Sequence, residues 1–193
     1  MVQEIKNITD IYLNLFKKYK EPIYKFIHSD CIEKDIIEDY EENLKILKLI
    51  AENCDSVFQV NSFFNLPSIA LLAGKPKLLA KIDDEINLSY YELINYIDDI
   101  ELLLYENSKN ILFKCNISVD LLFVNNYIKK NNSDSFYDII FNNIKPEKFI
   151  IIEGIDDYFF KKIDYLLNIN EWKIYYLNKK KFDFIVLKSN IIK

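Results

Sequence analysis

Apolar residues follow two different patterns along the chain, and the pattern changes at about residue 56. Before that point, they recur every three or four residues, at Ile37, Tyr40, Leu44, Leu47, Ala51 and Cys54. This spacing places them in one stripe along a helix over residues 35–54, with glutamates and lysines on the opposite side. The preceding stretch also has helical spacing, interrupted at Pro22. We therefore predict an N-terminal helical extension over residues 1–34, followed by a main domain over residues 35–193.

From residue 56 onward, short apolar runs alternate with helical patterns. The runs cover residues 57–60, 77–82, 100–105, 120–124 and 148–152. Runs of this length are typical of strands that are buried on both faces of a parallel sheet. The helical segments between them include residues 68–74, where Gly74 is the expected C-cap. Residues 171–178 and 182–189 are two further strand patterns with too short a connection for a helix, so they predict an antiparallel hairpin at one edge of the sheet.

Composition limits the partners and the location of the protein. The net charge is −5, and the one basic run, Lys179–Lys181, falls between two predicted strands, so we expect no nucleic-acid partner. The longest apolar runs have four to six residues, whereas a membrane-spanning helix needs about 20. No signal-peptide pattern opens the sequence. With three cysteines and one histidine, the chain has too few ligands for a structural metal site. We therefore expect a cytoplasmic protein with no metal and no membrane partner.

The order of these elements, together with several local strings, resembles the class I S-adenosylmethionine (SAM)-dependent methyltransferases. The strings are ENCDSVFQV with SIALLAGKPKLLAKID, DLLFVNN, KFIIIEG and the closing NEWKIYYLNKKKFDFIVLKS. The resemblance covers about residues 35–190 and points to small bacterial methyltransferases of the kind associated with glycan biosynthesis. It implies a Rossmann-like α/β fold with a seven-stranded sheet: five parallel strands, a C-terminal antiparallel hairpin, and helices on both faces.

The cofactor loop is where this sequence departs from that family. In the family, the first strand ends in an acid and continues as E-x-G-x-G-x-G, because the backbone there turns tightly and approaches the cofactor closely. The matching positions here are Gln59, Asn61, Phe63 and Asn65. Asparagine tolerates a positive φ, so Asn61 and Asn65 could keep a similar backbone path. Phe63 would fill space that the methionine end of the cofactor uses, and Gln59 cannot pair with an ammonium group as a carboxylate does.

Other cofactor positions are better preserved. The resemblance implies that Asp83, at the end of the second strand, binds the ribose, and that Glu106 and Asn107, after the third, lie near the adenine. The acid after the fourth strand is replaced by Asn125, which cannot act as a general base. Glu153, after the fifth strand, could serve as an acid or a base. The sequence therefore identifies cofactor-binding positions but no catalytic residue.

These substitutions favour a methyltransferase-like protein with reduced or no methyl transfer that acts as a binding or scaffold module. The alternative is an active, divergent SAM-dependent methyltransferase with a small-molecule or glycan-linked acceptor, because methyl transfer can rely on positioning alone. A third interpretation is another small-molecule ligand at the carboxyl edge of the sheet. Aromatic residues of the N-terminal extension could form the surface for a protein partner or a homodimer.

Overall fold

The computed structural model of the protein describes residues 34–61, 66–83, 100–106, 116–126, 134–178 and 183–191. Residues 1–33 of the predicted N-terminal extension therefore lie outside the described residues. The same holds for Phe63, Asn65, Asn107 and the basic run 179–181.

The described elements alternate between helices and strands for most of the chain. The helices are α3 (Lys34–Ala51), α4 (Leu66–Ala73), α7 (Asp134–Asn143) and α8 (Asp157–Asn168). The strands are β1 (Ser56–Val60), β2 (Leu78–Asp83), β3 (Glu101–Glu106), β4 (Ile117–Asn125), β5 (Ile144–Glu153), β6 (Trp172–Asn178) and β7 (Phe184–Ser189). None of the helices in these segments combines the length and the apolar character that crossing a membrane requires.

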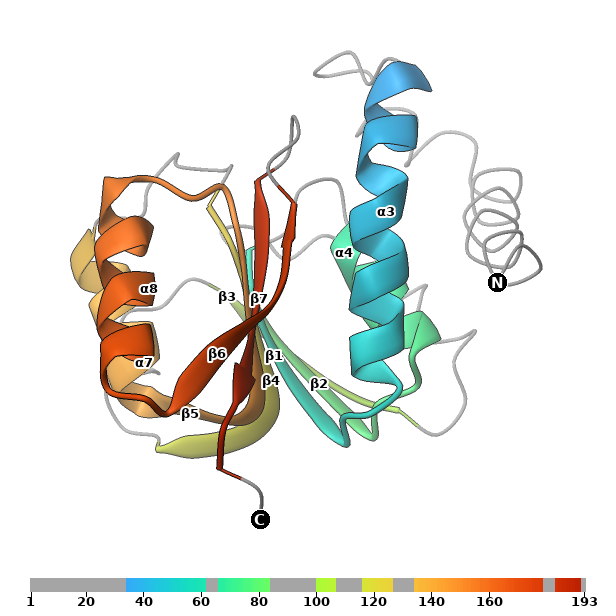
Figure 1. Cartoon of the computed structure of the whole chain (residues 1–193). Helices are drawn as coiled ribbons and strands as arrows, with labels where there is room; N and C mark the ends of the chain where they lie inside the picture. Colours follow the sequence, from blue (N-terminus) through green and yellow to red (C-terminus); the bar gives the residue numbers. More distant parts are fainter. Residues whose placement is uncertain are drawn as a thin grey trace.

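The strands form one sheet in the order β3-β2-β1-β4-β5-β7-β6 (Figure 1). Strands β1 to β5 pair in parallel, and β7 lies between β5 and β6, antiparallel to both. The edge strand β6 has an irregular register between Ile174 and Tyr176, where one extra residue is accommodated. The prediction of a mixed α/β sheet with a terminal antiparallel hairpin is confirmed.

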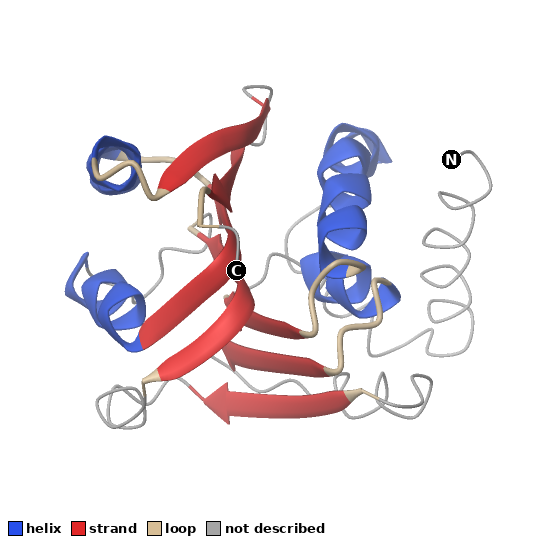
Figure 2. Ribbon diagram, turned by 60° about the horizontal axis from the view of Figure 1, so that its bottom comes forward, coloured by secondary structure: helices blue, strands red, loops and turns tan. Residues whose placement is uncertain are grey.

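Helices cover both faces of this sheet, as predicted. Figure 2 shows α3 and α4 on one side and α7 and α8 on the other. Neighbouring residues of a strand point to opposite faces, so Val57 belongs to the core cluster below α3 and α4, and Phe58 to the cluster below α7 and α8. Both side chains are fully buried, which explains why the strands read as continuous apolar runs.

The end of α4 gives a predicted residue a second role. Gly74 directly follows the last helical residue, Ala73, at the C-cap position that the sequence predicts, and the residue with a left-handed backbone is the next one, Lys75, with φ 58°. The Lys75 N–H donates to the carbonyl oxygen of Leu72 at 2.9 Å. Gly74 also serves packing, because a Cβ at this position would lie 2.5 Å from the Cβ of Ala51 in α3. The glycine therefore allows the two helices to approach each other.

Candidate functional site

Polar side chains gather where the parallel strands end, on the face covered by α3 and α4. Asn125 of β4 and Glu153 of β5 are partners in the sheet register. Asn61 directly follows β1 and lies beside Asn125, because the residues before them, Val60 and Val124, are paired. In open α/β sheets, ligands bind beyond these carboxyl ends. This edge is therefore the candidate ligand site.

Gln59, at the position of the acid in the methyltransferase pattern, is fully buried, and protein groups already bind its side chain. Its Oε1 accepts a hydrogen bond from the Ser68 hydroxyl of α4 at 3.0 Å. Its Nε2 donates to the backbone carbonyl of Asn61 at 3.1 Å. Both ends of the amide are thus used within the fold, and the side chain is held against α4.

Asn61 has the backbone conformation that its residue type allowed, with φ 58°. Its backbone N–H donates to the carbonyl of Ile82 at 2.8 Å, and its Nδ2 donates to the carbonyl of Asn125 at 3.3 Å. The side chain is 1% exposed, and within the described part of the chain its Oδ1 accepts no hydrogen bond. A buried oxygen without a donor is costly, so this atom is a candidate acceptor for a donor group of a ligand or for an ordered water.

Asn125 and Glu153 form the second half of the edge. Asn125 Nδ2 donates to Glu153 Oε2 at 2.7 Å, and both side chains are fully buried. Next to them, Asn126 Nδ2 donates to the carbonyl of Gly154 at 2.8 Å, and the Tyr137 hydroxyl donates to Asn126 Oδ1 at 3.0 Å. These bonds tie the ends of β4 and β5 to each other and to α7.

The structure brings four of the predicted cofactor residues to this edge. Gln59 and Asn61 lie at the end of β1, and Asp83 and Glu106 are the last residues of β2 and β3, paired in register. They follow one another along the sheet from β1 through β2 to β3. The described residues contain no group of three or more His, Cys, Asp or Glu side chains that could hold a metal ion.

Two residues of the site were missed by the sequence prediction. Ser68 binds Gln59 from α4, and Lys81 is 1% exposed and pairs in register with Gln59. A lysine inside an apolar run of a strand with two buried faces is unusual, since a charged group is rarely buried without a partner. That contrast within LLAKID could have indicated a polar interior near Gln59.

Comparisons with known proteins identify the fold. No protein-family model matches the chain, and no curated protein matches it significantly. Among solved structures, a proposed methyltransferase from Escherichia coli is 7% identical with a TM-score of 0.55, over 83% of this chain and 89% of the other. The ribosomal protein L11 methylase of Lactobacillus delbrueckii is 16% identical with a TM-score of 0.51, over 77% and 80%. The O-methyltransferase TomG of Streptomyces achromogenes, solved with SAM, is 14% identical with a TM-score of 0.50, over 77% and 79%. The chain shares the fold of SAM-dependent methyltransferases.

Proposed function

We propose that this protein is a methyltransferase-fold binding or scaffold module with reduced or no methyl transfer. The observation that carries the proposal is that the buried side chain of Gln59 is uncharged and already hydrogen-bonded within the protein. A cofactor with an ammonium group at its methionine end needs a negative or accepting partner at this place. Gln59 has no charge, so it cannot form an ion pair with an ammonium group, and its Oε1 already accepts a hydrogen bond from Ser68. The residues present therefore do not fit the methionine end of SAM.

The residues present fit the adenosine end of SAM better than its methionine end. Asp83 and Glu106 are carboxylate residues at the ends of β2 and β3, the positions that the resemblance to methyltransferases assigns to the ribose and the adenine. Asn61 supplies the positive φ that a glycine would supply. These features support a second candidate function, an active divergent SAM-dependent methyltransferase on a small-molecule or glycan-linked acceptor.

The groups at the ends of β4 and β5 favour the first candidate. A general base must reach the proton that it removes and must have a suitable pKa. Asn125 has no basic group, and the Oε2 of Glu153 is bound to Asn125 at 2.7 Å inside the fold. These side chains stabilise the end of the sheet instead of facing an acceptor.

A thermal-shift titration with SAM and S-adenosylhomocysteine separates the two candidates. Ligand at a hundred times its Kd adds about 2.7 kcal/mol to stability. At about 2–4 °C per kcal/mol for a chain of this size, the expected rise in Tm is roughly 5–10 °C. We expect no shift at millimolar ligand. A rise of that size that disappears in Asp83→Ala would overturn the proposal and establish the cofactor site.

A scaffold role also requires a macromolecular partner. We propose that this partner is another protein or a second copy of the chain, bound through the aromatic residues of the N-terminal segment. Analytical ultracentrifugation at high protein concentration tests the homodimer, and a monomer mass throughout would exclude it.

A further inference from the structure

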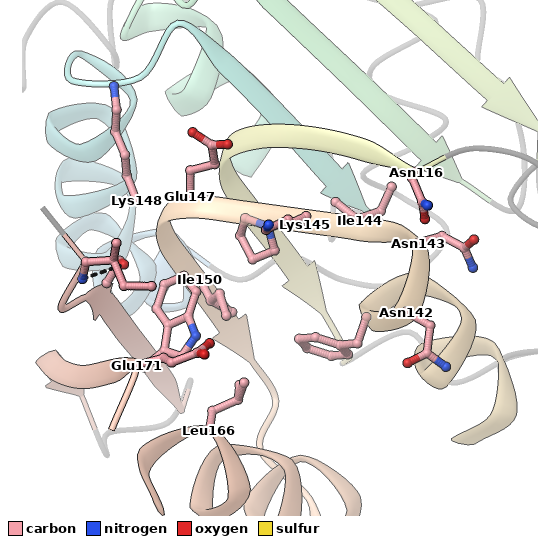
Figure 3. Close-up of a pocket in the computed structure, with 15 residues that line it drawn as sticks. Asn116, Asn142, Asn143, Ile144, Lys145, Glu147, Lys148, Ile150, Leu166 and Glu171 are labelled. Atoms are coloured by element: carbon pink, nitrogen blue, oxygen red, sulfur yellow. Dashed lines mark hydrogen bonds between the residues drawn. The ribbon is translucent and has the colours of Figure 1, made fainter. Parts of the chain in front are cut away.

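A pocket lies near the amino-terminal ends of β5 and β6, on the face of the sheet covered by α7 and α8, whereas the candidate site lies at the carboxyl ends of the parallel strands on the face covered by α3 and α4. It opens between α7, α8 and the amino-terminal ends of β5 and β6 (Figure 3). Its volume is about 560 Å³, within the range of roughly 300–1,000 Å³ that is usual for small-molecule sites. A ligand here would not touch the candidate site at the carboxyl edge.

The floor of the pocket is apolar and partly aromatic. Trp172 of β6, Phe141 of α7, Leu166 of α8 and Ile150 of β5 line it, and Trp172, Leu166 and Ile150 are also members of the core cluster below α7 and α8. The pocket is therefore an opening into this core, where an apolar ring would be removed from water. The indole N–H of Trp172 donates no hydrogen bond within the described residues, so it is also available as a donor to a ligand.

The rim carries four charged side chains, two of which are already engaged. Lys148 binds Asp120 and the carbonyl of Asn53, each at 3.1 Å, and Figure 3 shows its side chain running away from Ile150 and Leu166. Glu147 accepts a hydrogen bond from Ser118 at 2.7 Å. Neither group needs a ligand.

The other two rim charges have no such partner. Lys145 and Glu171 line the pocket and are exposed, and no other side chain of the described segments forms an ion pair or hydrogen bond with either of them. One is a cation and the other an anion, so a ligand that satisfies both must itself carry both signs. The C-terminal ends of α7 and α8 also border the pocket and add partial negative charge, which favours an ammonium group on the ligand.

We propose that this pocket binds a small zwitterion with an aromatic body, of the size of a free aromatic amino acid. The ring lies against Trp172 and Phe141, the ammonium group pairs with Glu171, and the carboxylate pairs with Lys145. Apolar burial supplies most of the affinity, and the two exposed ion pairs select among ligands of similar shape.

The chain contains a single tryptophan, so the fluorescence of Trp172 reports on this pocket directly. Purified protein is titrated with phenylalanine and three related compounds. Phenylpropionate lacks the ammonium group, phenethylamine lacks the carboxylate, and alanine lacks the ring. We expect a saturable change in Trp172 emission with phenylalanine, weaker binding of phenylpropionate and phenethylamine, and no response to alanine. No saturable response to phenylalanine, or an equal response to alanine, would overturn the proposal.

Substitutions of the two exposed residues Lys145 and Glu171 test which charged group of the ligand each residue binds. Lys145→Gln should raise the Kd of phenylalanine and phenylpropionate by roughly two- to fivefold and leave that of phenethylamine unchanged. Glu171→Gln should raise the Kd of phenylalanine and phenethylamine and spare phenylpropionate. Lys173→Gln, an exposed lysine outside the pocket, is the matched control and should change none of them. If both pocket variants bind all compounds as the wild type does, the pairing with Lys145 and Glu171 is wrong.

Discussion

Replacing Gly74 by alanine tests how closely α3 and α4 pack. The added Cβ would lie 2.5 Å from the Cβ of Ala51 and 2.9 Å from both the backbone carbon of Ala51 and the backbone nitrogen of Glu52. Non-bonded carbon atoms are normally about 3.5–4 Å apart, so the two helices must separate by roughly 1 Å. Ala51 is fully buried in the core cluster below these helices, and the movement would therefore loosen that core.

The magnitude follows from two opposing effects. Overpacking of a core costs about 1–3 kcal/mol. Alanine also restricts the unfolded chain, which stabilises by about 0.4–1 kcal/mol where the native backbone suits it, and the φ of Gly74 is not positive. We expect a net loss of about 1–2 kcal/mol, or roughly 2–8 °C in Tm.

Urea unfolding followed by tryptophan fluorescence and far-UV circular dichroism measures this loss. Lys75→Gly is the neighbouring control: it relieves a left-handed backbone, so its stability should equal that of the wild type or exceed it by up to about 1 kcal/mol. Ala51→Gly added to Gly74→Ala should recover only part of the loss, since the two backbone contacts remain. Wild-type stability of Gly74→Ala would refute the close approach of the helices.

Three further predictions concern buried polar groups. Burial raises the pKa of the Cys54 thiol to about 12, so in the folded protein it should react with iodoacetamide much more slowly than after unfolding, as peptide mass spectrometry can measure. Burial and the hydrogen bond to Glu42 likewise raise the pKa of Tyr176 to about 12. Both groups keep their protons in the folded state at a pH where the unfolded chain releases them. Their contribution to stability is therefore complete below about pH 9 and is lost as the pH rises towards 12. The urea midpoint should fall as the pH increases, and above pH 9 it should at first fall less steeply in Cys54→Ala than in the wild type. Asn125→Leu should cost about 1–3 kcal/mol in urea unfolding, because the buried Oε2 of Glu153 loses its hydrogen bond from Asn125, whereas Glu153→Gln should cost less because its amide oxygen can still accept.

The sequence was most informative where both faces of a strand are buried. The run at residues 148–152 correctly located β5, but the strand begins at Ile144, immediately after α7. Its first residues include Pro146 and charged side chains, which are uncommon within strands. They extend the strand because β4 pairs with them from Ile117 onward, and such pairing between distant segments leaves no local signal.

In the candidate site, too, local properties could be predicted from the sequence, whereas contacts between distant segments could not. The positive φ of Asn61 followed from its residue type, which is a local property. The bonds between Ser68 and Gln59 and between Asn125 and Glu153 did not, because each depends on which elements pack side by side. Gly74 directly follows α4, as predicted, but its close contact with Ala51 depends on the packing of α4 against α3 and exists only in the folded protein.

The position of β7 has a consequence for synthesis on the ribosome. Strand β6 pairs with β7 alone, although β6 emerges from the ribosome first. Until β7 follows, the nascent chain carries β6 without a partner and leaves the outer edge of β5 open, next to the apolar run Phe149–Ile152. Unpaired strand edges of this kind promote aggregation and are bound by chaperones. Until β7 is complete, the growing polypeptide therefore exposes strand edges that favour association with its neighbours.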